Sequence, residues 1–144
     1  MQILSPESET DFTRYFDLRW RILREPWGQP RGSERDTLEG DSWHRMACLS
    51  GRIPVGVARL HLNSPAQAQI RYMAVERESR QRGIGTALVA ALEQQAWALG
   101  VTEIVLHARE AALDFYLRLG YEELGAADTL YGCIRHRAMR KWRV

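Results

Sequence analysis

One short segment of the chain combines the residue types that bind an anionic group. It reads Arg80-Gln81-Arg82-Gly83-Ile84-Gly85-Thr86, and a run of apolar residues at helical spacing follows it. Paired glycines permit a ligand to approach the backbone closely, and the first N–H groups of a helix point outward at the positive end of its dipole. The arginines add positive charge, and the threonine adds a hydroxyl donor. The segment therefore predicts a phosphate-binding turn, unless its glycines only form a turn before a core helix.

Two common nucleotide-binding patterns do not fit this segment. A P-loop needs a lysine directly before its Ser or Thr, and the residue before Thr86 is Gly85. The Rossmann fingerprint needs a third glycine where Leu88 stands, and its first glycine directly follows a strand. Both patterns are excluded, so the phosphate would belong to another class of ligand.

The elements that position this segment are predicted by the spacing of apolar residues. Helices are expected at 9–24, where Ser8 is an N-cap and Asp11 completes a capping box, at 84–99 and at 111–119. Residues 26–41 have loop composition, with a helical turn expected within 34–39. Strands are expected at 1–4, 43–49, 55–62, 68–75, 101–106, 121–124 and 130–139, with residues 125–128 joining the last two.

These strands are expected to form a mixed sheet. The strands at 43–49, 55–62 and 68–75 follow one another through short turns and read as an antiparallel meander. The strand at 101–106 is a continuous apolar run rich in β-branched residues, which is typical of a strand covered on both faces in a parallel pair.

Composition limits the class of protein. The chain has 144 residues, of which 45% are hydrophobic and 26% charged, and its formal net charge is +2. These values predict one soluble domain over residues 1–144. No apolar run reaches the roughly 18 residues that cross a bilayer, so no membrane partner is expected. Cys48 and Cys133 lie in apolar strand-like segments with no signal-type segment ahead of them, which predicts reduced core thiols in a cytoplasmic protein.

Two other groups of side chains are of types that form binding sites. Basic residues gather at 135–143, where they would contact nucleic acid or, in the interpretation we favour, protect an edge strand from aggregation. The histidines are scattered without metal-ligand spacing, and neither cysteine has a CxxC partner. We therefore expect no metal, and nucleic acid is a disfavoured partner.

Two motifs together resemble one enzyme family. Arg80-x-x-Gly83-x-Gly85 resembles the Q/R-x-x-G-x-G/A signature of the GNAT N-acetyltransferase superfamily. The stretch from Ala112 to Tyr121, which reads ALDFYLRLGY, resembles that family's A-x-x-F-Y-x-x-L-G-[FY] stretch. The expected order of strands and helices also agrees from end to end, whereas the residues before Trp43 match only in general layout.

The resemblance implies a fold and a co-substrate. The fold would be a single α/β (α+β) domain, with a strongly bent mixed sheet of six to seven strands, helices on both faces, and two central parallel strands that splay apart. Acetyl-CoA would place its diphosphate on the glycine-containing turn and its pantetheine arm in the gap between those strands. The implied cofactor contacts are Met73, Ala74, Val75, Arg80, Gln81, Arg82, Gly83, Ile84, Gly85, Thr86, Arg109 and Ala112.

The resemblance also implies that an acceptor amine attacks the thioester directly and that Tyr116 protonates the departing CoA thiolate. A phenol has a reference pKa of about 10, so it keeps its proton at neutral pH and can donate it. Main-chain N–H groups near Met73 and Val75 would polarise the thioester carbonyl. The alternative is that Tyr116 is an aromatic core residue beside Phe115.

The base that deprotonates the amine departs from the family pattern, so a different carboxylate, His44 or a water chain must serve, or the amine must arrive neutral. In the histone-acetylating branch of the family a glutamate lies four positions before the equivalent of Met73, and this chain has Gln69 there. Glu39, Asp41 and His44 are substrate-binding candidates because the family builds its acceptor pocket from this region, although each is equally a loop residue. Glu34 and Asp36 lie beside them, and an acidic pocket would favour a cationic amine.

A second departure from the family is Arg109, which stands where many relatives carry an asparagine. It would either reach a CoA phosphate or be a surface arginine. Besides N-acetyl transfer to a primary amine of a small molecule or protein, the missing glutamate leaves open a non-catalytic CoA-binding module, and the basic tail leaves open a nucleic-acid adaptor. Exposed edge strands leave room for a homodimer.

Overall fold

Seven strands form one mixed sheet in the computed structural model, which describes residues 1–144. Their order is β1-β2-β3-β4-β5-β7-β6, in which β4 and β5 are parallel and every other neighbouring pair is antiparallel. The mixed sheet and the antiparallel meander are therefore confirmed. The strands are β1 (Gln2–Leu4), β2 (Trp43–Cys48), β3 (Pro54–Leu62), β4 (Gln67–Val75), β5 (Glu103–Arg109), β6 (Glu122–Leu130) and β7 (Ile134–Trp142).

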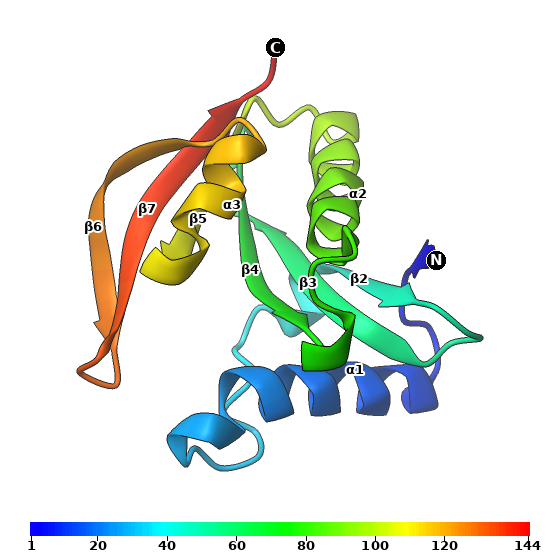
Figure 1. Cartoon of the computed structure of the whole chain (residues 1–144). Helices are drawn as coiled ribbons and strands as arrows, with labels where there is room; N and C mark the ends of the chain where they lie inside the picture. Colours follow the sequence, from blue (N-terminus) through cyan, green and yellow to red (C-terminus); the bar gives the residue numbers. More distant parts are fainter.

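Helix α1 (Glu9–Leu23) covers one face of the sheet (Figure 1). It begins at the predicted capping box, in which the Ser8 hydroxyl accepts from the Asp11 N–H and the Asp11 carboxylate accepts from the Ser8 N–H. Its buried side contributes Tyr15 and Leu18 to a core cluster that also contains Met46, Cys48, Val57 and Ala74. Helix and strands thus bury a continuous apolar layer on this face.

Helices α2 (Ile84–Ala98) and α3 (Leu113–Arg118) cover the opposite face. Helix α2 packs very closely on β3 at Gly56, where an added Cβ would lie 2.7 Å from the Ile84 Cγ2 atom. Short 3-10 turns complete the chain as η1 (Glu25–Trp27), η2 (Glu39–Asp41), η3 (Arg77–Ser79) and η4 (Glu110–Ala112). The predicted arrangement, with helices on both faces, is confirmed.

The two central parallel strands pair over only part of their length. Pairing runs from Gln67 opposite Glu103 to Ile70 opposite Leu106, and the strands have no partner in each other beyond that point. Just after the last pair, Tyr72 has a φ of 59°, and the register between β3 and β4 shifts at this bulge. A bulge bends its strand, and Figure 1 shows β4 curving away from the β6–β7 hairpin. The predicted splay is confirmed.

The last two strands differ from the prediction. The expected link at 125–128 is part of β6, which continues to Leu130, and the chain turns at 131–133. Gly125 has a φ of 142° at a register shift, so it forms a bulge, whereas Tyr131 and Gly132 both have positive φ and form the turn. Sequence reasoning took the bulge glycine for the turn glycine. Cys133 is consequently an exposed turn residue and not a core thiol, while Cys48 is buried as expected.

Two smaller expectations also need correction. Strand β7, which carries the basic residues, is not an edge strand, because it lies between β5 and β6. Some of its charges are paired with acidic neighbours: Arg140 with Glu122 at 2.6 Å, and Lys141 with Glu93 at 3.1 Å. The helical turn expected within 34–39 lies instead at η2. None of the helices has both the length and the hydropathy that a membrane crossing requires.

Candidate active site

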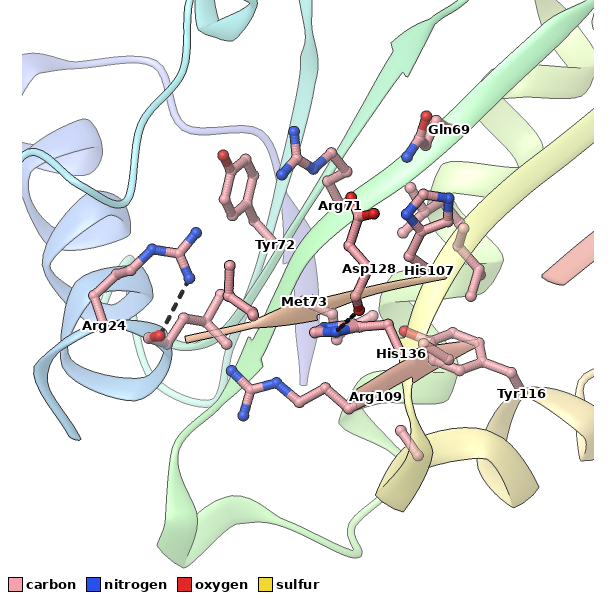
Figure 2. A pocket seen from close by; sticks show the side chains of 16 residues that line it. Arg24, Gln69, Arg71, Tyr72, Met73, His107, Arg109, Tyr116, Asp128 and His136 are labelled. Atoms are coloured by element: carbon pink, nitrogen blue, oxygen red, sulfur yellow. Dashed lines mark hydrogen bonds between the residues drawn. The ribbon is translucent and has the colours of Figure 1, made fainter. Parts of the chain in front are cut away.

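A cavity of about 390 Å³ occupies the place where β4 and β5 separate. Both strands line it, together with the end of α1, the start of α3 and the β6–β7 hairpin (Figure 2). The bulge at Tyr72 and the lost pairing beyond Ile70 therefore create the space directly. Its lining residues are Leu23, Arg24, Gln69, Ile70, Arg71, Tyr72, Met73, Leu106, His107, Ala108, Arg109, Ala112, Tyr116, Asp128, Leu130 and His136.

The segment at residues 81–86 presents unpaired main-chain donors. None of its six N–H groups donates a hydrogen bond within the protein, and the first bond of α2 runs from the Ala87 N–H to the Gly83 carbonyl. The segment is exposed except at Ile84 and Gly85. Free N–H groups at the start of a helix attract anions, so this end of α2 has the geometry that binds a phosphate.

The two glycines of this segment are needed for different reasons. Gly83 has a φ of 76°, a conformation that strains other residues, although there is open space around its Cα atom. Gly85 has an ordinary φ, but an added Cβ would lie 3.1 Å from the Phe115 ring. Gly83 therefore shapes the turn, and Gly85 lets α3 pack against the start of α2. This packing links the candidate phosphate turn to the helix that carries Tyr116.

Tyr116 lies at the boundary between the core and the cavity. Its side chain is 6% exposed, and its ring packs on Phe115 and Tyr121 with centroid distances of 4.9 and 5.8 Å. Burial raises the pKa of Tyr116 to about 12, and no hydrogen-bond partner offsets that effect. Figure 2 shows its hydroxyl end turned toward the part of the cavity that contains Met73. The residue can thus offer a proton to a ligand there.

His136 presents a free ring nitrogen in the same cavity. Its Nδ1 atom lies 3.2 Å from the Asp128 carbonyl and 3.0 Å from the Ile134 carbonyl. Because carbonyl oxygens only accept hydrogen bonds, Nδ1 carries the proton, and Nε2 of the neutral ring keeps its lone pair. No protein group bonds to Nε2, so it can accept a proton from a bound ligand.

Arginine side chains give the cavity a positive charge. Arg109 is half-buried and has neither a hydrogen bond nor an ion pair within the protein. Burial, together with the like charges of Arg24 and Arg80, lowers the pKa of Arg109. Arg24 donates only to main-chain carbonyls, at 3.1 Å to Ser33 and 3.2 Å to Leu23. Neither charge is neutralised by a carboxylate.

The structure divides the predicted cofactor residues into three groups. Met73, Arg109, Ala112 and Tyr116 line the cavity. The turn at 80–86 lies at the start of α2, where the Arg80 Nε atom donates to the Val75 carbonyl at 3.4 Å. Ala74 and Val75 lie outside the cavity lining, Ala74 buried in the core cluster under α1 and Val75 packed against the cluster on the opposite face.

The three predicted substrate residues do not line the cavity. The Glu39 carboxylate accepts from Arg19 at 3.0 Å and from Arg59 at 2.7 Å. His44 is buried, with Nδ1 2.9 Å from the Tyr15 hydroxyl and Nε2 2.8 Å from the Glu39 carbonyl. Burial lowers the pKa of His44, so its neutral ring is fully engaged by the protein. Asp41 is exposed in η2.

These acidic residues neutralise buried arginines and do not form a pocket wall. Arg59 has no exposed side-chain surface and pairs with Asp36 at 2.7 Å as well as with Glu39. Arg19 is equally buried and also receives support from the Glu34 carbonyl. The hypothesis that an acidic pocket attracts a cationic amine therefore loses its basis. The charged residues that do line the cavity are three arginines and one carboxylate, Asp128.

Sequence reasoning did not identify His136 or Arg24 as site residues. His136 was counted with the basic tail because the turn of the hairpin was misplaced, and the true turn brings β7 back along β5. No local sequence signal would have placed it, because only the register of β6 with β7 shows that the turn lies at Tyr131-Gly132. The structure contains no group of three or more His, Cys, Asp or Glu side chains arranged to hold a metal.

Comparisons with known proteins agree with this geometry. The chain is 27% identical over 141 residues to YjcF of Bacillus subtilis (strain 168), described as an uncharacterized N-acetyltransferase, and the match covers 98% of this chain and 99% of that protein. A crystal structure from Lactobacillus plantarum, described as a candidate N-acetyltransferase, has a TM-score of 0.86 at 21% identity and covers 99% of this chain and 98% of its own.

A crystal structure of aminoglycoside 6'-N-acetyltransferase complexed with coenzyme A has a TM-score of 0.82 at 19% identity, with 99% of this chain and 97% of that chain covered. At this identity the likeness shows the fold alone. The model of the acetyltransferase (GNAT) family matches residues 12–121, which include both motifs and most of the cavity. The chain belongs to the acetyltransferase (GNAT) family.

Proposed function

We propose that this acetyltransferase moves the acetyl group of acetyl-CoA to a primary amine by direct attack of the amine on the thioester. The observation that carries the proposal is the cavity between the separated strands β4 and β5, next to a helix start with unpaired N–H groups. A coenzyme with a diphosphate at one end and a thioester at the end of a narrow arm fits these two features together. No step requires a metal.

The turn at 80–86 would hold the diphosphate through its N–H groups, with Arg80 and Arg82 adding charge at the rim. The pantetheine arm would then run beside the part of β4 that has no partner in β5. A main-chain N–H near Met73 would point at the thioester carbonyl and stabilise the negative charge that develops on its oxygen. These roles leave the side chains of β5 and β7 free for the acceptor.

In the chemical step the amine nitrogen forms a bond to the thioester carbon, and the bond from that carbon to sulfur breaks. The amine proton passes to Nε2 of His136, whose other nitrogen is fixed by main-chain carbonyls. The sulfur takes the proton of Tyr116. After the products leave, Tyr116 regains a proton from solvent and His136 releases one to it. Burial disfavours an anionic thiolate just as it disfavours the phenolate, so the raised pKa of Tyr116 does not prevent this transfer.

The test is thiol release from acetyl-CoA in the presence of a panel of amines. Tyr116→Phe should lower kcat about 100-fold, the typical contribution of a general acid, while KM for acetyl-CoA changes less than about twofold. Tyr131→Phe, at an exposed tyrosine outside the cavity lining, is the matched control and should leave kcat unchanged.

Two results would contradict the proposal. An unchanged kcat in Tyr116→Phe removes this residue from the mechanism. Binding of acetyl-CoA with no thiol release for any amine would instead favour a non-catalytic CoA-binding module, the alternative raised by Gln69.

A further inference from the structure

Three arginines line the cavity, and their charge bears on which acceptor can bind there. Arg24, Arg71 and Arg109 line the cavity from the end of α1, from β4 and from β5. Asp128 is the only carboxylate among the lining residues, and it lies exposed on β6. A cavity with this composition attracts negative charge and repels a polycation.

Two of these arginines have no acidic partner in the protein. Arg109 forms no hydrogen bond or ion pair, and the Arg24 guanidinium donates only to carbonyl oxygens. Arg71 differs, because it pairs with Asp36 at 3.2 Å. A half-buried guanidinium without a neutralising carboxylate is costly to maintain, so Arg24 and Arg109 have the environment of residues that bind an anionic ligand.

The positions of these side chains separate the reacting end of the cavity from its charged end. Figure 2 shows the guanidinium groups of Arg24 and Arg109 on the side nearer α1, and Tyr116 on the opposite side, with Met73 and His136 between them. A ligand whose amine lies beside His136 would therefore extend toward these two arginines, neither of which has an acidic partner. We propose that the acceptor is a primary amine that carries an acidic group, a carboxylate or a phosphate, which Arg24 and Arg109 bind.

An anion at this place has two conceivable sources, the acceptor and the coenzyme. The coenzyme diphosphate already has six unpaired N–H groups at residues 81–86, which do not line the cavity. Arg24 follows the last residue of α1 and so belongs to a different element from the turn at 80–86. The acceptor is therefore the better-matched source, and this inference rests on the transferase function proposed above.

Matched pairs of amines test the inference directly. Each pair differs only in its acidic group: β-alanine against β-alaninamide, and phosphoethanolamine against ethanolamine, with cadaverine as a dication. The acidic member of at least one pair should have a kcat/KM at least about tenfold higher than its neutral partner, the effect expected of a charge-assisted hydrogen bond. Equal or inverted values with measurable turnover would overturn the inference and leave the transferase function standing. Absence of turnover for every amine would overturn both.

Substitutions then distinguish the two sources of the anion. Arg109→Gln and Arg24→Gln should each reduce the preference for the acidic amine about tenfold without raising KM for acetyl-CoA. Arg109 is the better position for this test, because its side chain forms no hydrogen bond or ion pair within the protein that the substitution would remove. Arg14→Gln, at an exposed arginine of α1, is the control and should keep the preference. A raised KM for acetyl-CoA with the preference intact would assign the arginines to the coenzyme phosphates and contradict the inference.

Discussion

Two regions of this molecule are rich in charged and polar side chains, and they differ in what those side chains face. The buried ion cluster under α1, made of Arg19, Arg59, Asp36 and Glu39, is internally paired at 2.7 to 3.0 Å. The cavity between β4 and β5 contains groups without partners, namely the guanidinium of Arg109 and Nε2 of His136. One residue of each group was a site candidate from the sequence, Glu39 in the cluster and Arg109 in the cavity, because their residue types bind charged ligands.

The difference shows that an unpaired group facing open space is a better sign of function than residue type. Glu39 and His44 have the chemistry of a base, but Oε2 of Glu39 and both ring nitrogens of His44 are bound to protein partners, and the other Glu39 oxygen is buried away from the cavity. The cluster also supports the cavity, because Tyr72, at the bulge of β4, lies among its arginines, with Arg19 and Arg59 at 4.3 and 4.8 Å from the ring centroid. We therefore expect substitutions in the two regions to change different quantities.

The largest effect should come from breaking the cluster. Arg59→Leu leaves Asp36 and Glu39 without their shared partner and should lower the free energy of unfolding by about 3 kcal/mol or more, as expected for a broken buried pair. Urea denaturation measures the change. Arg71→Leu also removes a partner of Asp36, but Arg71 is 43% exposed, so its cost should stay below about 1 kcal/mol. Equal losses in the free energy of unfolding for the two variants would contradict the idea that burial makes the Arg59 pairs more important than the Arg71 pair.

The next effect should appear in turnover and not in stability. His136→Gln removes the nitrogen that we propose accepts the amine proton and should lower kcat about 100-fold, while the midpoint of urea denaturation stays close to that of the wild type. His107→Gln is the informative comparison, because His107 also lines the cavity but is exposed. If kcat falls in His107→Gln and not in His136→Gln, then His136 is not the base.

The smallest effect should come from the phosphate turn. Gly83→Ala forces a Cβ into a φ of 76° and should cost about 1 kcal/mol, seen as a several-fold rise in KM for acetyl-CoA with little change in kcat. Gly85→Ala should act differently, since its Cβ would push against Phe115, next to Tyr116, and so lower kcat as well. Indistinguishable kinetics of the two variants would contradict the separate roles assigned to these glycines.

The sequence predicted the fold well where the signal is local or repeated. The helical spacing in α2 and the capping box at Ser8 are set within a few residues, and the structure confirms both elements. The splay of β4 and β5 was predicted only through the family resemblance. No local sequence pattern predicts that the pairing of β4 with β5 stops after Ile70. The bulge at Tyr72 depends on the register of β4 with β3.

The acceptor side of the site was predicted least well. Gly125 and Gly132 look equivalent in the sequence, and only the register of β6 with β7 shows that one is in a bulge and the other in the turn. Because the turn was misplaced, His136 was not predicted to lie in the site. The partners of Glu39 could not be predicted either, because Arg19 and Arg59 lie 20 positions away on opposite sides in the sequence.

The central claim is that the N–H groups of residues 81–86 bind the coenzyme diphosphate while the buried ion cluster takes no part. Titration of coenzyme A into isotope-labelled protein, followed through amide signals in 1H–15N correlation spectra, tests it directly. We predict large, saturable shifts at residues 81–86 and near Met73, and small ones at Arg19, Arg59 and Glu39. Saturable binding that leaves the signals of residues 81–86 in place would contradict the account.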